Sequence, residues 1–422
     1  MSAADQRTAE GSNNLGRIVG AGVSGSFLEW YEFGVYAYVA TTLAASFFPQ
    51  SDPAAGLLAT FGIFATGYLM RPVGAIVLGH VGDHYSRKAG LIVSVSLMTV
   101  ATGAMAFLPT YQSIGILAPV LLTVLRLVQG FAVGGEYTGS IVLLAESAPP
   151  NRRALLACLA LVSGTLGVMA ASGAAALFTV LLTSEQFSAW GWRLLYAPTP
   201  LLGIVGLFLR RRLTASLDLR PSRLPIVAVM RQHRTALLKV IGLVAALAVG
   251  NYTTLVYGAT YLTTTVGVKA SEALTATTVG NFALVVSALT SAVLTDRFGR
   301  RPVMLGAASA LLALAYPLYA LLHSSTWSPV LTMTCFGLLV GLVGGALAVW
   351  MTEIFPRAVR YTGVSLGYGL AIGILGGTTP LIATTGLDIT RDPLFPALYI
   401  MLAAAVTLVT AYFTPETKGK PI

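Results

Sequence analysis

The sequence has 422 residues, of which 55% are hydrophobic and only 10% are charged, and its mean hydropathy is +0.78. Soluble domains usually carry about 25% charged residues, so this composition excludes an ordinary soluble protein and indicates a polytopic membrane protein. The formal net charge of +10 has two possible meanings, nucleic-acid binding or membrane topology, and the positions of the basic residues distinguish them.

Apolar runs long enough to cross a bilayer as helices, which takes about 20 residues, occupy most of the chain. Twelve such runs are predicted, at residues 17–47, 54–80, 88–108, 113–140, 154–182, 190–210, 236–265, 272–295, 302–322, 327–352, 359–385 and 393–413. The first run is too long and too rich in glycine for a cleaved signal peptide, so we expect a retained helix. The sequence therefore predicts an all-α polytopic membrane protein with twelve transmembrane helices.

Most of the 26 basic residues fall in segments that share one side of the membrane if both termini lie inside. This asymmetry is the positive-inside pattern, so the positive charge indicates topology and not nucleic-acid binding. We expect a multi-pass protein of the bacterial inner membrane with both termini cytoplasmic. The predicted parts are a polar N-terminal tail at 1–16, a bundle at 17–210, a basic linker at 211–235, a second bundle at 236–413 and a tail at 414–422.

Two charged turns, residues 83–88 and 296–301, lie about half the chain length apart, and each separates two apolar runs. A second repeat relates Glu146 and Arg152, at a helix end in the first half, to Glu353 and Arg357 in the second half. Such repetition predicts two similar six-helix halves. We expect salt bridges among these helix ends to form a gate that can open again, because exposed pairs contribute only about 0–1 kcal/mol each. The alternative is that these charges only determine the membrane topology. The gating candidates are Asp83, Arg87, Glu146, Arg152, Asp296, Arg300, Glu353 and Arg357.

Further motifs resemble the major facilitator superfamily and, within it, the metabolite–proton symporters, which include citrate, tricarballylate, α-ketoglutarate, shikimate and proline/betaine permeases. The matching segments are 24–32 (SGSFLEWYE), 71–74 (RPVG), 126–130 (RLVQG), 134–137 (GGEY), 191–193 (GWR) and 376–380 (GGTTP). The resemblance implies two pseudo-symmetric six-helix bundles with the substrate between them. His84 and Ser86 depart from the Arg or Lys and the Gly that are usual in the family, so the first charged turn is expected to be the weaker latch.

Ionisable groups inside a bilayer are costly and are functional candidates by default. Five remain inside the runs: Glu29, Glu32, Arg71, Arg126 and Glu136. Counted at about 1.5 Å per residue, Glu29, Glu32 and Arg126 lie near the midplane, whereas Arg71 and Glu136 lie nearer the cytoplasm. We expect Arg71 and Glu136 to stabilise the bundle as a pair, with a proton role for Glu136 as the alternative.

The guanidinium of Arg126 suits a carboxylate, because its donor fork matches two oxygens in parallel. The alternative is that Arg126 only neutralises Glu29 or Glu32. A substrate carboxylate on Arg126 would remove the counter-ion of a neighbouring glutamate and so favour its protonation. Glu29 and Glu32 are both candidates for the proton carrier, and the sequence does not decide between them.

Neutral polar residues complete the predicted substrate site. They are Tyr31 and Gln129 in the first half, and Asn251, Tyr252, Tyr257, Asn281 and Tyr368 in the second. Tyr257 and Tyr261 are four residues apart and are expected to share a helix face, where they either cover the substrate or anchor the helix at the membrane interface.

Other chemistry has little support in the sequence. Cys158 and Cys335 lie in apolar helices in opposite halves, so neither a disulfide nor a metal site is expected. His80 and His84 have the spacing of two metal ligands on a helix, but Asp83 is the only nearby residue that could be a third ligand. No catalytic triad, zinc-protease motif or phosphate-binding loop is present, so we expect no enzyme and no cofactor beyond the proton as coupling ion.

The sequence therefore predicts a secondary transporter that takes up a small organic acid, such as a di- or tricarboxylate, with protons by alternating access. The first alternative is an osmolyte symporter for betaine or proline, which we expect less because the long C-terminal coiled coil of osmosensing relatives is missing. A drug efflux antiporter and a nutrient sensor are further alternatives. We expect a monomer in the lipid bilayer, with a small organic acid or zwitterion as its ligand.

Overall fold

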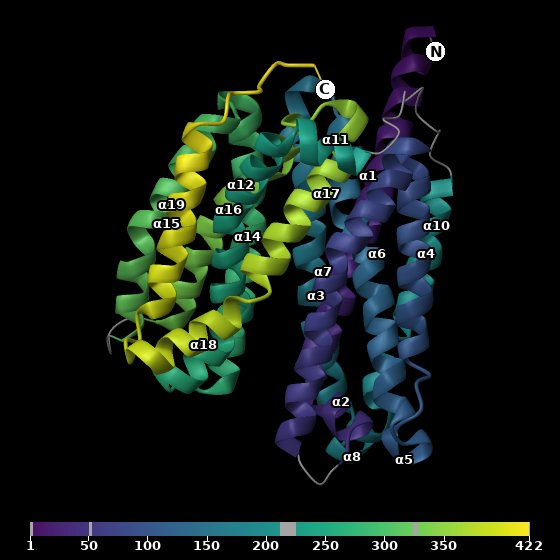
Figure 1. The fold of residues 1–422 in the computed structure, drawn as a ribbon, viewed down its shortest axis with the longest axis vertical. Coiled ribbons are helices and arrows are strands. Elements are labelled where there is room, and N and C mark those ends of the chain that lie inside the picture. Colours follow the sequence, from purple (N-terminus) through teal and green to yellow (C-terminus); the bar gives the residue numbers. More distant parts are fainter. Residues whose placement is uncertain (1–2, 50–52, 212–224, 324–327, 422) are drawn as a thin grey trace. The chain divides into compact units, whose positions relative to one another are not determined.

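The computed structural model describes residues 3–49, 53–211, 225–323 and 328–421, and all regular structure in these ranges is helical (Figure 1). The all-α prediction is confirmed. The long helices are α1 (Ala3–Tyr38), α3 (Pro53–His84), α4 (Arg87–Met105), α6 (Leu117–Ser147), α7 (Arg153–Leu181), α10 (Pro198–Arg211), α12 (Arg234–Asn251), α14 (Ala270–Phe298), α15 (Arg300–Leu322), α16 (Pro329–Glu353) and α19 (Phe395–Tyr412). Shorter helices are α2 (Ala40–Phe47), α5 (Tyr111–Ile114), α8 (Ser184–Gln186), α9 (Trp192–Leu194), α11 (Pro225–Gln232), α13 (Gly258–Tyr261), α17 (Arg360–Ala371) and α18 (Thr379–Thr390).

Within the described residues, eleven helical segments are long and apolar enough to cross a membrane. The first predicted run, 17–47, lies in α1 and α2 and is not one of the eleven, because Glu29, Glu32 and several glycines lower its average hydropathy. Helix α1 also begins at Ala3, well before the predicted start at residue 17. The polar segment preceding the apolar run contains strong helix formers such as Ala, Gln, Arg and Glu, which allow the helix to extend.

The chain divides into two compact units. The first comprises Met1–Ser147 and Ser163–Ile226, and the second comprises Ala148–Val162 and Val227–Ile422. The start of α7, up to Val162, thus belongs with the second unit. Residues 212–224 of the predicted linker lie outside the described residues, and the predicted boundaries of bundles and tails remain predictions.

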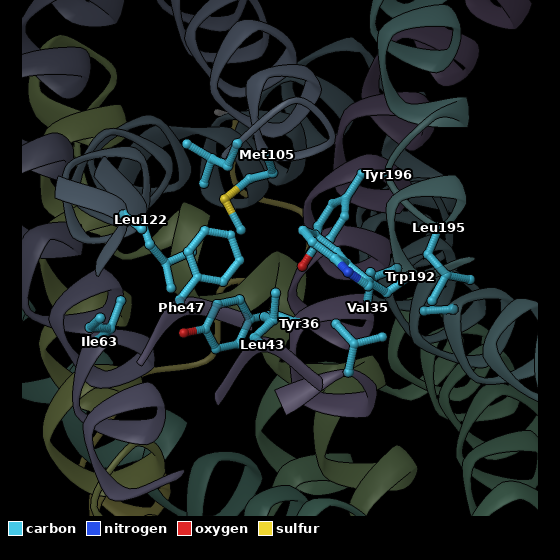
Figure 2. Close-up of a cluster of buried hydrophobic side chains, with 14 of the residues drawn as sticks. Val35, Tyr36, Leu43, Phe47, Ile63, Met105, Leu122, Trp192, Leu195 and Tyr196 are labelled. Carbon is cyan, nitrogen blue, oxygen red and sulfur yellow. The ribbon is translucent and has the colours of Figure 1, made fainter. Parts of the chain in front are cut away.

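In the first unit α6 packs against α3 and α4, and α4 also packs against α10. A cluster of buried aromatic and aliphatic side chains from α1, α2, α6 and the segment around α9 forms part of its core (Figure 2). Phe47 meets Trp192 edge to face at 5.8 Å between ring centroids. Trp192, from the GWR motif, is fully buried, and Arg193 donates a 2.9 Å hydrogen bond to the Leu108 carbonyl. This motif therefore anchors a helix end within the first unit.

In the second unit α14 packs along α16 and α15 packs along α19 (Figure 1). Two of its predicted membrane helices are interrupted by π-helical turns. The run 236–265 contains η3 (Tyr252–Val256) and η4 (Leu262–Val266), and the run 359–385 contains η6 (Ile372–Gly376) before α18 begins at Thr379. The motif at 376–380 therefore lies where the helix is broken. Such π turns often occur at functional sites.

Candidate functional site

Three ion pairs lie inside the first unit, and all six side chains are nearly or completely buried. Glu29 of α1 lies 3.6 Å from Arg71 of α3, and Glu32 of α1 accepts a 2.6 Å hydrogen bond from Arg126 of α6. Glu136 of α6 pairs with Arg210 of α10. The six charges cancel. Buried charges are tolerated when paired in this way, so the set is electrically neutral and joins four helices.

The pairing differs from the sequence prediction. Glu136 was expected to pair with Arg71, but it binds Arg210 through two guanidinium nitrogens, while Arg71 pairs with Glu29. Arg210 was not among the predicted buried charges, because it ends the predicted apolar run 190–210 and opens the basic run 210–212. A signal was nevertheless present, since Thr199, Gly203, Gly206 and Arg210 recur at helical spacing and form the buried stripe of α10.

Further contacts from neighbouring helices fix the pair of Glu136 and Arg210 in place. Arg210 also donates hydrogen bonds to the carbonyl oxygens of Ala21 and Leu91, which brings α1 and α4 to the pair. A Cβ on Gly25 would collide with both charged groups, so only glycine lets α1 approach this closely. These contacts assign a structural role to Arg210 and to the glycine of the SGSFLEWYE motif.

The pair of Arg126 and Glu32 is buried too, but its hydrogen bonds are less complete. Its Nη1 donates to Glu32, but Nε and Nη2 of Arg126 and Oε2 of Glu32 are buried without a hydrogen-bond partner among the described residues. The guanidinium carbon lies 3.7 Å from the ring centroid of Tyr36, whose hydroxyl donates to the Thr60 carbonyl. Buried polar groups normally have partners. The site therefore offers two unused donors and one unused acceptor side by side.

Four aromatic rings from α1 and α3 surround the guanidinium groups, and we call Phe33, Tyr36, Phe64 and Tyr68 the aromatic cluster. Neighbouring ring centroids in it are 5.2 to 5.8 Å apart. The Arg71 guanidinium carbon lies 4.6 Å from the rings of Phe33 and Tyr68, and that of Arg126 lies 5.5 Å from Phe33. Tyr36 also belongs to the core cluster of Figure 2, which fixes one wall of the site.

Tyr31 and Gln129, the remaining candidates in the first unit, differ in what they can offer. The Tyr31 hydroxyl donates a 2.8 Å hydrogen bond to the Leu195 carbonyl, so this donor is already used. Gln129 donates to the Thr102 hydroxyl at 3.0 Å, but its Oε1 is buried and unused within the described residues. Of the two, Gln129 retains a polar atom for a ligand.

The candidates of the second unit lie at or near the π-helical turns. Asn251 ends α12 and is half-buried, Tyr252 begins η3, and Tyr257 follows it. The rings of Tyr257 and Tyr261 are 6.5 Å apart, which confirms the shared face, and the Tyr261 hydroxyl donates to the Pro393 carbonyl. Asn281 donates to the Thr277 carbonyl, and Tyr368 is buried in α17. Their binding roles remain predictions.

The predicted gate residues of the second unit form a tight cluster at one end of α14, α15 and α16. Arg300 donates two hydrogen bonds, of 2.8 and 2.9 Å, to the Glu353 carboxylate and lies 3.7 Å from Asp296. Three of the predicted gate residues, Asp296, Arg300 and Glu353, thus form salt bridges with one another. Asp296 also accepts the backbone N–H groups of Ala154 and Leu155 and so caps the start of α7.

In the first charged turn Asp83 is buried, whereas the side chain of Arg87 lies outside the described ones. Glu146 is half-buried and Arg152 is exposed. Gating by these groups remains a prediction.

A carboxylate that the sequence analysis missed, Glu416, follows α19. It accepts backbone N–H groups from Arg300 and Arg301 at 3.0 and 2.9 Å, and from Thr417 and Lys418 in its own segment. It thereby caps α15, whose preceding residue, Gly299, has a φ of +112° that favours glycine. Burial alone would raise the pKa of the Glu416 carboxyl, but the four N–H groups hold its pKa below the usual value.

Replacing Glu416 by alanine is expected to lower the free energy of unfolding at neutral pH by about 1 kcal/mol, the usual contribution of a helix cap. Because folding lowers the pKa of Glu416, its contribution is present above the unfolded value of about 4.3 and is lost as the pH falls through the folded pKa. Thermal unfolding of the purified protein in detergent at several pH values measures this. Glu185→Ala, at an exposed site, is the control. Equal stability of Glu416→Ala and the parent at neutral pH would contradict the capping role.

Known proteins match this chain over nearly its whole length. The family described as "Sugar (and other) transporter" matches residues 19–216 and 223–422. A proline/betaine transporter of Salmonella typhimurium is 30% identical over 97% of this chain and 85% of its own. An ectoine/proline transporter of Corynebacterium glutamicum is 33% identical over 95% of this chain and 84% of its own. A glycine betaine/proline/ectoine/pipecolic acid transporter of Dickeya dadantii is 30% identical over all of this chain and 87% of its own.

Solved structures show the same fold. A proton:xylose symporter of the major facilitator superfamily superposes with a TM-score of 0.78 at 17% identity, covering 97% of this chain and 98% of the other. A second transporter of this superfamily, in its outward conformation, gives a TM-score of 0.66 at 20% identity over 93% and 98% of the two chains. The chain is a multi-pass membrane transporter and not an enzyme. It belongs to the sugar (and other) transporter family of the major facilitator superfamily.

Proposed function

We propose that this transporter is a proton-coupled symporter that imports a small zwitterionic osmolyte, such as betaine or proline, across the bacterial inner membrane by alternating access. Both termini would then lie in the cytoplasm. The relatives named as proline/betaine transporters, at about 30% identity over almost the whole chain, support this substrate class. They favour the alternative of the sequence analysis over its first choice, a di- or tricarboxylate.

The observation that carries the proposal is the half-satisfied pair of Arg126 and Glu32. A zwitterion has one carboxylate and one cation, and the unused Nε and Nη2 of Arg126 and Oε2 of Glu32 offer one complementary group to each. A carboxylate fits the donor fork of the guanidinium, and the cation fits the glutamate oxygen. A di- or tricarboxylate would bring further negative charge next to Glu32, where like charges repel.

The aromatic cluster adds selectivity for the cationic end of the substrate. Quaternary ammonium groups bind to aromatic ring faces, and each favourable contact contributes about 0.5–2 kcal/mol. The four rings lie within the same region as Arg71 and Arg126, whose guanidinium groups already pack on them. The cluster can therefore accept the trimethylammonium group of betaine once the guanidinium of Arg126 turns toward the substrate carboxylate.

Replacing Phe64 by leucine is expected to raise the KM for betaine uptake about tenfold, since it removes one ring of the aromatic cluster while keeping an apolar side chain. The KM for proline, whose ammonium is smaller and hydrogen-bonds, should rise less. Initial uptake rates in proteoliposomes measure both constants. Phe107→Leu is the matched control, because Phe107 is 84% exposed. An unchanged KM for betaine would show that the cluster does not contact the substrate.

Proton coupling follows from the same charges. A substrate carboxylate on Arg126 removes a counter-ion from the buried glutamates, and an uncompensated buried carboxylate takes up a proton more readily. Protonation and substrate binding therefore favour each other, which is the thermodynamic requirement for coupling.

The experiment that tests the proposal is uptake by the purified protein in liposomes with an acid-outside gradient, using labelled glycine betaine, proline, ectoine, citrate and α-ketoglutarate. We expect accumulation of the zwitterions and none of the acids. Accumulation of citrate or α-ketoglutarate without any zwitterion would restore the organic-acid interpretation and refute this one.

A further inference from the structure

We propose that Glu29 is the residue that carries the coupled proton, and that the pair of Glu32 and Arg126 is left to the substrate. This inference rests on the proposed function, because it divides that function between two ion pairs one helical turn apart on α1. The sequence leaves Glu29 and Glu32 equivalent, whereas the structure distinguishes them by how well each negative charge is compensated.

The three buried carboxylates differ in their hydrogen bonds. Glu136 accepts two from Arg210, which is itself fixed by two backbone carbonyls. Glu32 accepts one hydrogen bond of 2.6 Å from Arg126. Glu29 has Arg71 at 3.6 Å, beyond a charge-assisted hydrogen bond, and its contact with the backbone N–H of Tyr137 falls short of a hydrogen bond. Of the three, Glu29 is the least compensated, and burial then favours its neutral form.

The counter-ion of Glu29 is also shared. The guanidinium of Arg71 lies over the rings of Phe33 and Tyr68 and 5.7 Å from the ring of Trp30, and its charge acts on Glu32 as well as on Glu29. The positive charge of Arg71 is therefore stabilised by aromatic rings and acts on two carboxylates, so it is not committed to Glu29 alone.

The other charged and titratable groups around Glu29 act in the same direction. Glu136 from α6, although paired with Arg210 from α10, and Glu32 on α1, although paired with Arg126 from α6, both add negative charge near Glu29. Tyr137 from α6 places its ring beside Trp30, with ring centroids 6.3 Å apart, and its backbone N–H faces Glu29. Among the charged groups that act on Glu29 in the described residues, Arg71 is the cation, so a proton on Glu29 relieves the repulsion from both carboxylates.

A short path links the two pairs. Glu29 and Glu32 are three residues apart and share a face of α1. The guanidinium carbons of Arg71 and Arg126 lie 4.6 and 5.5 Å from the same ring, that of Phe33. When a zwitterion binds, its carboxylate draws the guanidinium of Arg126 away from Glu32, and its cation on the aromatic cluster repels Arg71, which packs on Phe33 and Tyr68 of that cluster. Glu29 then loses its only nearby cation and binds a proton from the open side of the membrane.

The first arm of the test needs no substrate. Infrared difference spectra of the purified protein, recorded between acidic and alkaline pH, report protonated carboxyl groups through their C=O stretch. We expect a band from a buried protonated carboxyl that disappears in Glu29→Gln and remains in Glu32→Gln. A band that disappears in Glu32→Gln and remains in Glu29→Gln would overturn the assignment.

The second arm measures transport in proteoliposomes. Glu29→Gln is expected to exchange betaine across the membrane without accumulating it against its gradient, because binding persists and coupling is lost. Glu32→Gln should lose exchange as well. Glu29→Asp should restore part of the accumulation, and Glu272→Gln, at an exposed site, is the matched control.

The outcomes separate the two proposals. If the parent protein transports betaine or proline and Glu29→Gln accumulates them normally, or loses exchange although it is folded by size-exclusion chromatography, the assignment of Glu29 is refuted and the substrate class stands. If the parent protein transports neither zwitterion, the proposed function fails, and the infrared arm still decides which carboxylate holds the proton.

Discussion

Replacing Arg126 by lysine is expected to lower kcat/KM for betaine and proline uptake by about a hundredfold. The guanidinium presents two unused donors, Nε and Nη2, in a fork that an ammonium cannot reproduce. Loss of a buried, charge-assisted bidentate contact costs about 3 kcal/mol, which corresponds to a factor of about one hundred. Initial uptake rates in proteoliposomes under a fixed pH gradient measure the effect.

Arg231→Lys is the control for this change, because Arg231 is exposed in α11 and has no assigned role. It should transport at the parent rate. Arg126→Lys with a normal KM and a normal rate would show that the guanidinium does not bind the substrate carboxylate, and that Arg126 only neutralises Glu32. The proposed binding of the substrate carboxylate to Arg126 would then be wrong.

The second large effect concerns stability. Replacing Arg210 by methionine leaves the Glu136 carboxylate buried without its counter-ion, which is expected to destabilise the protein by about 3–5 kcal/mol. Two further acceptors, the carbonyl oxygens of Ala21 and Leu91, lose their donor as well. The yield of monodisperse protein and its thermal unfolding in detergent measure the loss.

A compensating variant shows whether the unpaired charge causes the loss. Adding Glu136→Leu to Arg210→Met removes both charges and should recover most of the stability, because a well-packed apolar pair can replace a buried ion pair. Arg211→Met is the matched control, since Arg211 is exposed at the next position. Equal stability of Arg210→Met and Arg211→Met would mean that Arg210 has no structural role.

The helical content and most helix positions could be predicted from the sequence, because apolar runs of membrane length have few alternatives to a helix. The start of α1 could not, since its apolar run is preceded by a polar segment of strong helix formers that continues the helix to Ala3. The π-helical turns near Tyr252 and Tyr261 were also missed, because they depend on local packing and not on composition.

Most of the buried charged residues of the site could be identified from the sequence, but the residues with which they form ion pairs could not. Depth along a helix follows from residue counting, whereas pairing depends on how each helix is rotated and tilted about its neighbours. Thus Glu136 was assigned to Arg71 when it binds Arg210, and the partner of Glu353 among the gate residues, which is Arg300, was left open. Glu416 was missed because a backbone cap leaves no charge pattern in the sequence.

The substrate class could not be predicted from the sequence, for a related reason. An arginine near the midplane fits any carboxylate, so Arg126 alone cannot separate citrate from betaine. The proposal of a zwitterion draws on its surroundings in space, where Glu32 supplies a negative charge at 2.6 Å and the rings of α1 and α3 supply faces for a cation.

The central claim is that a zwitterion and a proton enter together. Its most direct test is the proton influx that external glycine betaine causes in proteoliposomes loaded with a pH-sensitive dye, without an imposed pH gradient. We predict that betaine or proline acidifies the lumen, that citrate does not, and that protein-free liposomes do not respond. Betaine entry without acidification, or acidification with citrate alone, would contradict the account.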